Sequence, residues 1–228
     1  MKQLLLDLAP PPAPTLDNFV PGRNAELVVA LYALANGASH ERFIYLWGAE
    51  GSGRSHLLHA VIDAARRNGR RTAWLGAAAE PLEAAGDVLW AVDDAHQLGA
   101  EAQIALFNLY NRIRNGEGAL ITSGNAAPAQ LPLRADLVTR LGAGLVYQLY
   151  GLDDEEKSAA LRRHADARGL KLSQEVTAYL LRHARRDMPS LLALLDALDR
   201  YSLETRRAVT VPLLREVLDA TARRSKNT

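Results

Sequence analysis

The sequence predicts an α/β fold in which a parallel five-stranded sheet carries helices and a small all-α domain follows. A glycine-rich loop lies between an apolar run at 43–47 and a helical pattern that begins near 54. Further apolar runs then alternate with helical patterns as far as 149. From Leu152 onward the pattern is helical only. Alternation of this kind indicates parallel strands joined by right-handed crossovers.

The glycine-rich loop has the strand, loop and helix layout of a phosphate-binding P-loop. Glycines let backbone N–H groups point inward, and the helix that follows adds the positive end of its dipole. The loop fits the pattern G-x-x-x-x-G-K-[ST], except that Arg54 replaces the lysine. Arginine keeps the charge but not the shape of an ammonium group. We therefore expect a nucleotide site with weak or no intrinsic ATPase activity; the alternative is a βα turn without a ligand.

Composition limits the function classes. The 228 residues are 48% apolar and 23% charged, and the net charge of +1 gives no global electrostatic case for binding nucleic acid or membrane. The absence of cysteine excludes disulfides and thiolate chemistry, and the six histidines show no metal-ligand spacing. No apolar run approaches the roughly 20 residues of a membrane span, and the N-terminus does not resemble a signal peptide. We expect a cytoplasmic protein.

The first 14 residues differ from the rest of the chain. The apolar cluster Gln3-Leu4-Leu5-Leu6-Asp7-Leu8 leads into a proline-rich spacer, which is stiff and extended. Such a segment can dock in a groove of another protein or lie on its own chain. We divide the chain into a tail and linker at 1–14, an α/β domain at 15–151 and a helical domain at 152–228.

A second acidic motif follows a buried strand. The run 88–92 is continuously apolar, as in a parallel strand covered on both faces, and it ends in Asp93 and Asp94. The carboxyl ends of such strands are where open α/β sheets bind ligands. Together with the P-loop, this predicts a Walker-B element in which Asp93 holds Mg²⁺ and Asp94 stands where a water-activating base belongs. Alone, the pair would be a helix cap or a loop.

The remaining elements follow from periodicity. Helical patterns cover 24–34, 102–113 and 136–141, and strands are expected at 70–76, 119–123 and 145–149. The strand at 119–123 ends in polar residues that could touch a γ-phosphate or form a plain turn. In the helical domain, Asp153-x-x-Glu156 is a capping box and Ser173 is an N-cap. The residues expected to point inward are Val176, Tyr179, Leu180, Leu191, Leu194, Leu195, Leu198, Leu214, Val217 and Leu218.

Several stretches resemble the DnaA/Hda branch of the AAA+ family. They are Thr15-Leu16-Asp17-Asn18-Phe19-Val20-Pro21-Gly22-Arg23-Asn24, the P-loop with Tyr45 to Ala60, and Phe107-x-Leu109-Tyr110-Asn111-Arg112. The resemblance spans about residues 15–220 and implies an AAA+ P-loop core with a helical lid. Gln3-Leu4-x-Leu6-x-Leu8 resembles the motif by which proteins bind the sliding clamp of DNA polymerase. We expect no DNA-binding domain after the lid.

The resemblance implies a negative regulator of replication initiation. Such a protein binds the DNA-loaded sliding clamp (the DNA polymerase III beta subunit) and promotes hydrolysis of DnaA-bound ATP through an arginine finger supplied in trans. ADP or ATP with Mg²⁺ would be the ligand, with ADP in a structural role. DNA contact would be indirect, a homo-oligomer is possible and no membrane is involved. The alternatives are an AAA+ ATPase acting as a helicase loader or remodeller, and a DnaA-like DNA-binding initiator fragment.

The resemblance also assigns residues. Arg140 falls at the arginine-finger position, with Arg134 as a weaker rival, and Phe19 and Val20 would line the adenine pocket. Asn125 falls at sensor 1 and Arg186 at sensor 2, while Ser55 and Asp93 would hold the metal. The clamp-binding residues would be Gln3, Leu4, Leu6 and Leu8. The remaining nucleotide-binding residues would be Gly48, Gly51, Ser52, Gly53, Arg54, His56 and Asp94.

Overall fold

The computed structural model describes residues 13–75 and 86–224. These residues divide into two compact units, an α/β unit formed by 14–151 and a helical unit that begins at Leu152. The predicted clamp-binding residues Gln3, Leu4, Leu6 and Leu8 lie outside the described residues. No helix within the two described ranges is both long enough and apolar enough to cross a membrane.

The α/β unit contains a five-stranded sheet in the order β2-β3-β4-β1-β5, and every strand pair is parallel. This confirms the predicted fold class. The register aligns Trp47 with Gly124 and Val92 with Thr122, so β1, β3 and β4 end at the same edge. The strands are β1 (Phe43–Trp47), β2 (Arg71–Trp74), β3 (Val88–Val92), β4 (Ala119–Gly124) and β5 (Leu145–Gln148).

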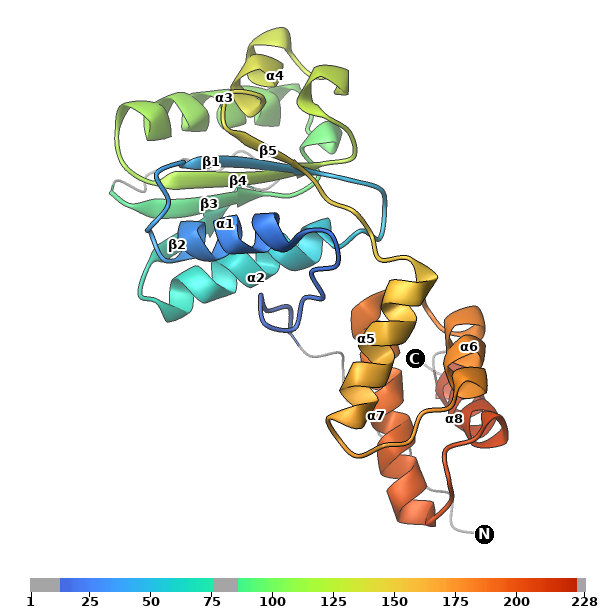
Figure 1. Ribbon diagram of the computed structural model, residues 1–228. Helices are drawn as coiled ribbons and strands as arrows, with labels where there is room; N and C mark the ends of the chain where they lie inside the picture. The colour runs from blue at the N-terminus through green and yellow to red at the C-terminus, as the bar shows by residue number, and fades with distance from the viewer. Residues whose placement is uncertain (1–12, 76–85, 225–228) are drawn as a thin grey trace. The chain divides into compact units, whose positions relative to one another are not determined.

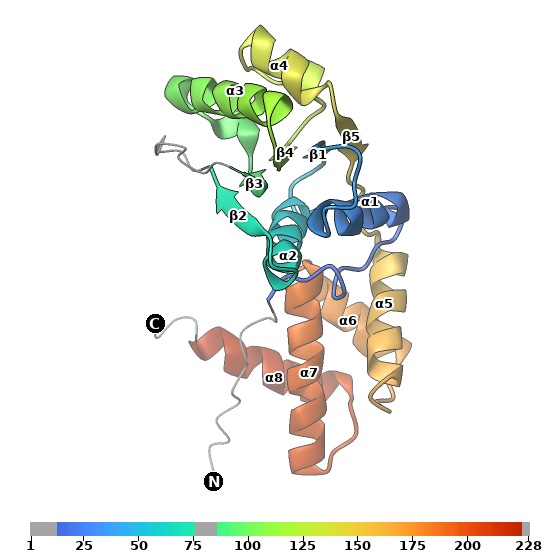
Figure 2. The same cartoon turned by 90° about the vertical axis from the view of Figure 1, so that its left-hand side faces the viewer.

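Helices cover both faces of this sheet, which makes a three-layer unit (Figure 1). The helices α1 (Ala25–Ala35) and α2 (Arg54–Arg67) lie on one face, and α3 (Ala100–Asn115) and α4 (Ala135–Leu141) lie on the other. Figure 2 shows the same layers from the side. Each face has its own apolar core because buried parallel strands are apolar on both sides. The helical pattern expected at 102–113 lies within α3, whose apolar face is buried at Ala102, Leu106, Leu109, Tyr110 and Ile113.

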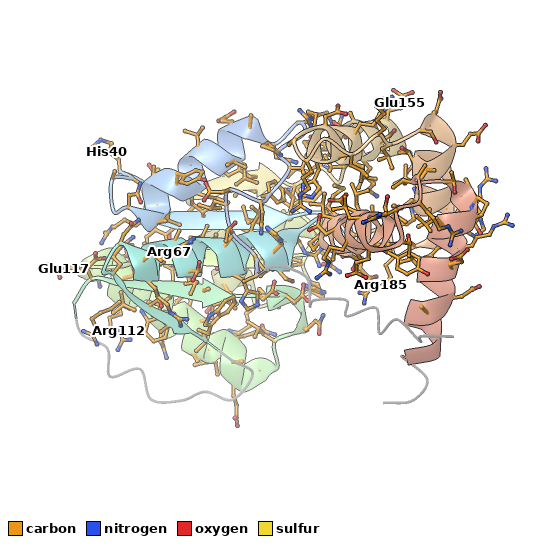
Figure 3. The ribbon with its side chains drawn as sticks, turned by 90° about the horizontal axis from the view of Figure 1, so that it is seen from below. His40, Arg67, Arg112, Glu117, Glu155 and Arg185 are labelled. Atoms are coloured by element: carbon orange, nitrogen blue, oxygen red, sulfur yellow. The ribbon has the colours of Figure 1, made fainter. Side chains whose placement is uncertain are left out.

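At the amino edge of the sheet, arginines tie the layers together. Arg70 donates to both carboxylate oxygens of Asp87 at 2.6 and 2.9 Å and also to the Leu34 carbonyl. Arg42 donates to backbone carbonyls at the end of α3. The edge is hollowed by a polar pocket of about 310 Å³ that Arg42, Arg70 and Glu117 help to line. Figure 3 shows His40 and Glu117 at this end of the unit.

The helical unit consists of α5 (Asp154–Asp166), α6 (Gln174–His183), α7 (Met188–Thr205) and α8 (Val211–Arg224). The predicted capping box is present, since Glu156 N donates to Asp153 Oδ1 at 2.8 Å and Asp153 N donates back to the Glu156 carboxylate. The Ser173 cap is also present. The core holds the predicted residues Val176, Leu180, Leu191, Leu194, Leu195, Leu198, Leu214 and Val217.

Tyr179 and Leu218, the other two residues expected to point inward, are partly buried and pack against this core. The Tyr179 ring stacks on His183 with centroids 4.1 Å apart, and Arg215 Nε donates to the Tyr179 hydroxyl at 3.1 Å. A tyrosine at the margin of a core buries its apolar ring while its hydroxyl keeps a polar partner.

Candidate functional site

The glycine-rich loop follows β1 and leads directly into α2, as predicted. Gly51 and Gly53 have φ of +74° and +104°, which only glycine adopts at low cost. Gly48 is constrained in another way, because a Cβ there would lie 2.5 Å from the Leu149 carbonyl oxygen and 2.9 Å from Ser52 Oγ. A Cβ at Gly53 would lie 3.0 Å from the Phe19 ring. The loop conformation therefore requires glycine at these points.

Two polar groups of the loop are buried without a partner. Ser52 Oγ and Arg54 Nε accept or donate no hydrogen bond among the described residues. Buried polar atoms are rarely left unpaired unless a ligand or water completes them. A hydroxyl and a guanidinium N–H at the start of a helix are donors suited to phosphate oxygens. The residues present therefore fit the phosphates of a nucleotide.

Asp93 and Asp94 lie at the carboxyl end of β3, which pairs directly with β4. Asp93 Oδ1 accepts a hydrogen bond from Ser123 Oγ and another from Asp94 N at 3.1 Å. Asp94 N also donates to Ser123 Oγ at 2.9 Å. The polar residue at the end of β4 that contacts Asp93 is thus Ser123, whereas the predicted sensor-1 residue, Asn125, is exposed.

The predicted magnesium ligands are the Ser55 hydroxyl and the Asp93 carboxylate. Both are oxygen ligands, and Mg²⁺ commonly takes one or two protein oxygens and completes its shell with waters and nucleotide phosphates. Ser55 is exposed at the start of α2, and Asp93 is half-buried. The described residues contain no group of three or more histidine, aspartate or glutamate side chains that could hold a metal ion. A magnesium ion bound there would neutralise phosphate charge.

Arg54 and Asp94, which the sequence assigned to separate roles, are paired. Arg54 Nη2 donates to Asp94 Oδ1 at 2.9 Å, and Nη1 donates to the Gly48 carbonyl. The side chain of Arg54 is 11% exposed and that of Asp94 34% exposed. Asp94 has φ 47° and ψ 50°, a left-handed conformation that is uncommon for a residue other than glycine. Gln97 Nε2 approaches the other Asp94 oxygen at 3.4 Å.

The segment before α1, where the sequence predicts an adenine pocket, packs on the end of the P-loop and the start of α2. The rings of Phe19 and His56 lie 5.6 Å apart, and Val20 is half-buried next to Phe19 in the chain. His56 Nε2 lies 3.1 Å from the Thr15 carbonyl oxygen. Burial lowers the pKa of His56 despite the opposing effect of that carbonyl, so the neutral ring is favoured.

Asn24 is a structural link that the sequence did not reveal. Its side chain is buried, accepts from Tyr150 N at 2.9 Å and donates to the carbonyl oxygens of Tyr150 and Pro21 at 2.8 and 2.9 Å. Arg23 also lies over the Tyr150 ring, 4.3 Å from its centroid. These contacts fix the segment over the P-loop to the chain that leaves β5. Only the long separation of 126 residues hid the pair.

The two candidate finger residues have different surroundings. Arg140, in the last turn of α4, lies over the rings of Phe107 and Tyr110 on α3, with its Cζ atom 5.9 and 5.7 Å from their centroids. Among the described residues, no carboxylate forms an ion pair with Arg140. Arg134 precedes α4 and forms an ion pair with Asp136 at 2.8 Å.

The predicted sensor-2 residue, Arg186, belongs to the helical unit. It lies between α6 and α7, is exposed, and forms an ion pair with Asp154 at the start of α5. Its neighbour Arg185 is 85% exposed and extends from this unit in Figure 3.

Comparisons with known proteins agree with this architecture. Residues 154–218 match the family model described as Hda, lid domain. The fold is similar to domain III of the Thermotoga maritima replication initiation protein DnaA, with 21% identity, 91% of this chain and 96% of that chain covered, and a TM-score of 0.68. AMPPCP-bound DnaA from Aquifex aeolicus is similar at 22% identity, with 86% of this chain and 70% of that chain covered and a TM-score of 0.64.

A further solved structure has a similar fold. The Thermotoga maritima RuvB Holliday junction branch migration motor is similar at 15% identity, with 90% of this chain and 71% of that chain covered and a TM-score of 0.64. Sequence identities this low show that the fold is shared and show nothing about function. The lid match is more specific, because it names one branch. Residues 154–218 therefore match the lid domain of Hda, and they follow an α/β unit whose fold is similar to that of DnaA domain III.

Proposed function

We propose that this chain is a DnaA-related inhibitor of replication initiation that promotes hydrolysis of DnaA-bound ATP. The N-terminal motif would hold it on the DNA-loaded sliding clamp, so that its contact with DNA is indirect. The α/β unit would bind ADP, or ATP, with Mg²⁺, and would then meet ATP-bound DnaA. Tethering on the clamp raises the effective concentration of the partner, so each contact can be weak.

The observation that carries this proposal is the state of Arg140. A guanidinium that no carboxylate of its own chain holds can meet a partner's phosphate without first breaking an ion pair. Arg140 meets that condition among the described residues, because its surroundings are the rings of Phe107 and Tyr110. Arg134 is occupied by Asp136. An arginine finger contributes about 10³–10⁵ in rate to nucleotide hydrolysis.

The loop supports a structural role for the nucleotide. Arg54 replaces the usual lysine and is paired with Asp94, the residue in the position of the base. The Asp94 oxygen that accepts the hydrogen bond from Arg54 is engaged and does not contact a water as a base must. Bound nucleotide would then stabilise the unit, while hydrolysis occurs in the partner.

The finger is tested with Arg140→Ala and with Arg134→Ala as the matched control. Both variants remove one arginine from the same segment, but only the first should abolish stimulation of ATP hydrolysis by DnaA on clamp-loaded DNA. Binding of ADP and clamp should persist in both. If Arg140→Ala still stimulates and Arg134→Ala does not, Arg134 is the finger; if both stimulate fully, the proposal of a finger in trans is wrong.

The tether is tested by a pull-down of purified chain with sliding clamp, with and without residues 1–8. The shortened chain should lose clamp binding and keep ADP binding. Equal recovery of the clamp by both chains would reject the proposed role of Gln3, Leu4, Leu6 and Leu8.

A further inference from the structure

Five exposed arginines gather at the amino edge of the α/β unit. Two lie in the last turn of α2, two in the last turn of α3, and one begins β2. Because α2 leads into β2 and α3 leads into β4, both helices end where the strands begin. Figure 3 shows Arg67 and Arg112 toward the end of the unit where Glu117 lies. We call this set the arginine edge; its members are Arg66, Arg67, Arg71, Arg112 and Arg114.

The sequence around the arginine edge contains no carboxylate that balances its charge. No aspartate or glutamate occurs from 64 to 75 or from 102 to 116. The C-terminus of a helix carries a partial charge of about −0.5, so two arginines at one helix end exceed what the dipole offsets. The last turn of α1 lies at the same edge and has no basic residue. The net charge of +1 therefore conceals a local positive surface.

The guanidinium groups of this surface are open to a ligand. Arg66 Nε donates to the neutral hydroxyl of Thr72 at 2.6 Å and forms no ion pair with the described residues. Arg114 likewise has no carboxylate partner in the described part of the chain. Arg67 pairs with Asp63 at 2.9 Å, but the two side chains are 55% and 49% exposed, and a pair this exposed contributes little and can open.

The surroundings of the arginine edge indicate what kind of partner it fits. The exposed large apolar side chains of the described residues do not lie at 66–71 or 112–117; they are Val29, Ile104, Val146, Tyr150 and Leu203. Protein–protein interfaces have an apolar centre that is depleted in charge, and single-stranded DNA needs aromatic side chains on which its bases stack. Duplex DNA needs neither, because it presents one phosphate charge per about 1.7 Å of its axis.

We propose that the arginine edge binds the phosphates of duplex DNA directly and without reading its sequence. Phosphate contacts position a protein on DNA and carry no sequence information. Because α2 and α3 lie on opposite faces of the sheet, the arginines are spread across the three layers and can meet more than one phosphate. The tether in the proposed function reaches DNA only through the clamp, whereas this second contact is direct and needs no clamp.

The test measures binding of the purified full chain to a labelled duplex of about 25 base pairs by fluorescence anisotropy, without clamp, between about 50 and 200 mM salt. The variant combines Arg66→Gln with Arg114→Gln, which removes two charges and breaks no ion pair. The matched control combines Arg163→Gln with Arg182→Gln, which removes two exposed arginines from the helical unit.

Binding by the unmodified chain should weaken as salt is added. The plot of log K against log salt should have a slope of about −3 to −5, since each neutralised phosphate contributes about −0.9. The variant at the arginine edge should lose about 2 units of that slope and raise the Kd about tenfold or more at 50 mM salt. The control should change the Kd by less than about threefold. Two duplexes of unrelated sequence should bind equally well.

The inference is wrong if the unmodified chain shows no salt-sensitive binding, or if both double variants weaken binding equally. A chain without residues 1–8 should still bind the duplex, and its failure to do so would place the contact in the tail instead. Binding of a poly-glutamate peptide in place of the duplex would identify an acidic protein segment as the partner and would also overturn the inference. Stimulation of DnaA is measured separately, so the proposed function stands or falls on its own tests.

If the double variant does not fold, Arg66→Gln and Arg114→Gln are measured one at a time. Each should lower the salt slope by about 1, the contribution of one phosphate contact. An unchanged slope in both single variants would reject the arginine edge as the DNA contact.

Discussion

Two arginine–aspartate pairs lie at opposite edges of the sheet, and they differ in whether every guanidinium nitrogen has a hydrogen-bond partner. At the amino edge, Arg70 binds both oxygens of Asp87 and a backbone carbonyl. At the carboxyl edge, Arg54 binds one oxygen of Asp94, and its Nε has no partner. The side chains of both arginines are nearly equally buried, with 13% and 11% exposed. A buried guanidinium whose nitrogens all have partners, as in Arg70, indicates a structural role. A buried guanidinium with a free N–H, as in Arg54, indicates a binding site.

The largest effect is expected from Arg70→Ala. It removes three hydrogen bonds from a buried guanidinium and should lower the free energy of unfolding by about 2–3 kcal/mol. Asp87 loses its partner, and the Leu34 carbonyl keeps only backbone donors such as Gly37 N. Arg67→Ala breaks an exposed pair and should cost under about 0.5 kcal/mol. Urea denaturation measures both. If Arg70→Ala also weakened ADP binding at a temperature where it is folded, the two edges would not be independent.

An intermediate effect is expected from Gly48→Ala and Gly118→Ala, one at each edge. An added Cβ would lie 2.5 Å from the Leu149 carbonyl oxygen in the first and 2.7 Å from the Val88 carbonyl oxygen in the second. Each should cost about 1–3 kcal/mol of stability, since backbone must move. Only Gly48→Ala should also raise the Kd of ADP. Equal loss of ADP binding in both variants would contradict the assignment of the site to the carboxyl edge.

The smallest effect concerns pH. Hydrogen bonding by Arg70 holds the pKa of Asp87 below its ordinary value, against the weaker opposing effect of burial. A depressed carboxyl pKa adds stability above the unfolded value of about 3.9 and loses it as the pH falls through the folded value. Asp87 is about half exposed, so solvent screening limits this to under about 1 kcal/mol.

That prediction is checked by measuring the free energy of unfolding between about pH 5 and pH 2. The curve of Asp87→Asn should be flatter than that of the unmodified chain over this interval. Parallel curves would mean that the Arg70–Asp87 pair does not contribute to acid sensitivity.

Much of the fold could be predicted because its signals are local. Continuous apolar runs identified the buried strands, and the glycine pattern placed the P-loop between β1 and α2. The pairing of Arg54 with Asp94 could not be predicted in the same way. Each residue was recognised by its own motif, but their contact depends on a left-handed backbone at Asp94 that the local sequence does not require.

Contacts between distant segments were also hidden from the sequence. Asn24 reads as the residue before a helix, yet its side chain binds the backbone of Tyr150 on both sides. Ser123 was one of several polar residues at the end of a strand, and only the register of β3 and β4 sets it beside Asp93. Such contacts arise from the packing of strands and helices, which periodicity does not encode.

The backbone at Asp94 has an evolutionary consequence. Glycine, asparagine and aspartate are the residues that enter a left-handed turn at little cost, so they are the replacements that mutation can most easily sample there. Two of these three carry no charge. A single substitution can therefore remove the charge that Arg54 binds while the surrounding loop keeps its shape.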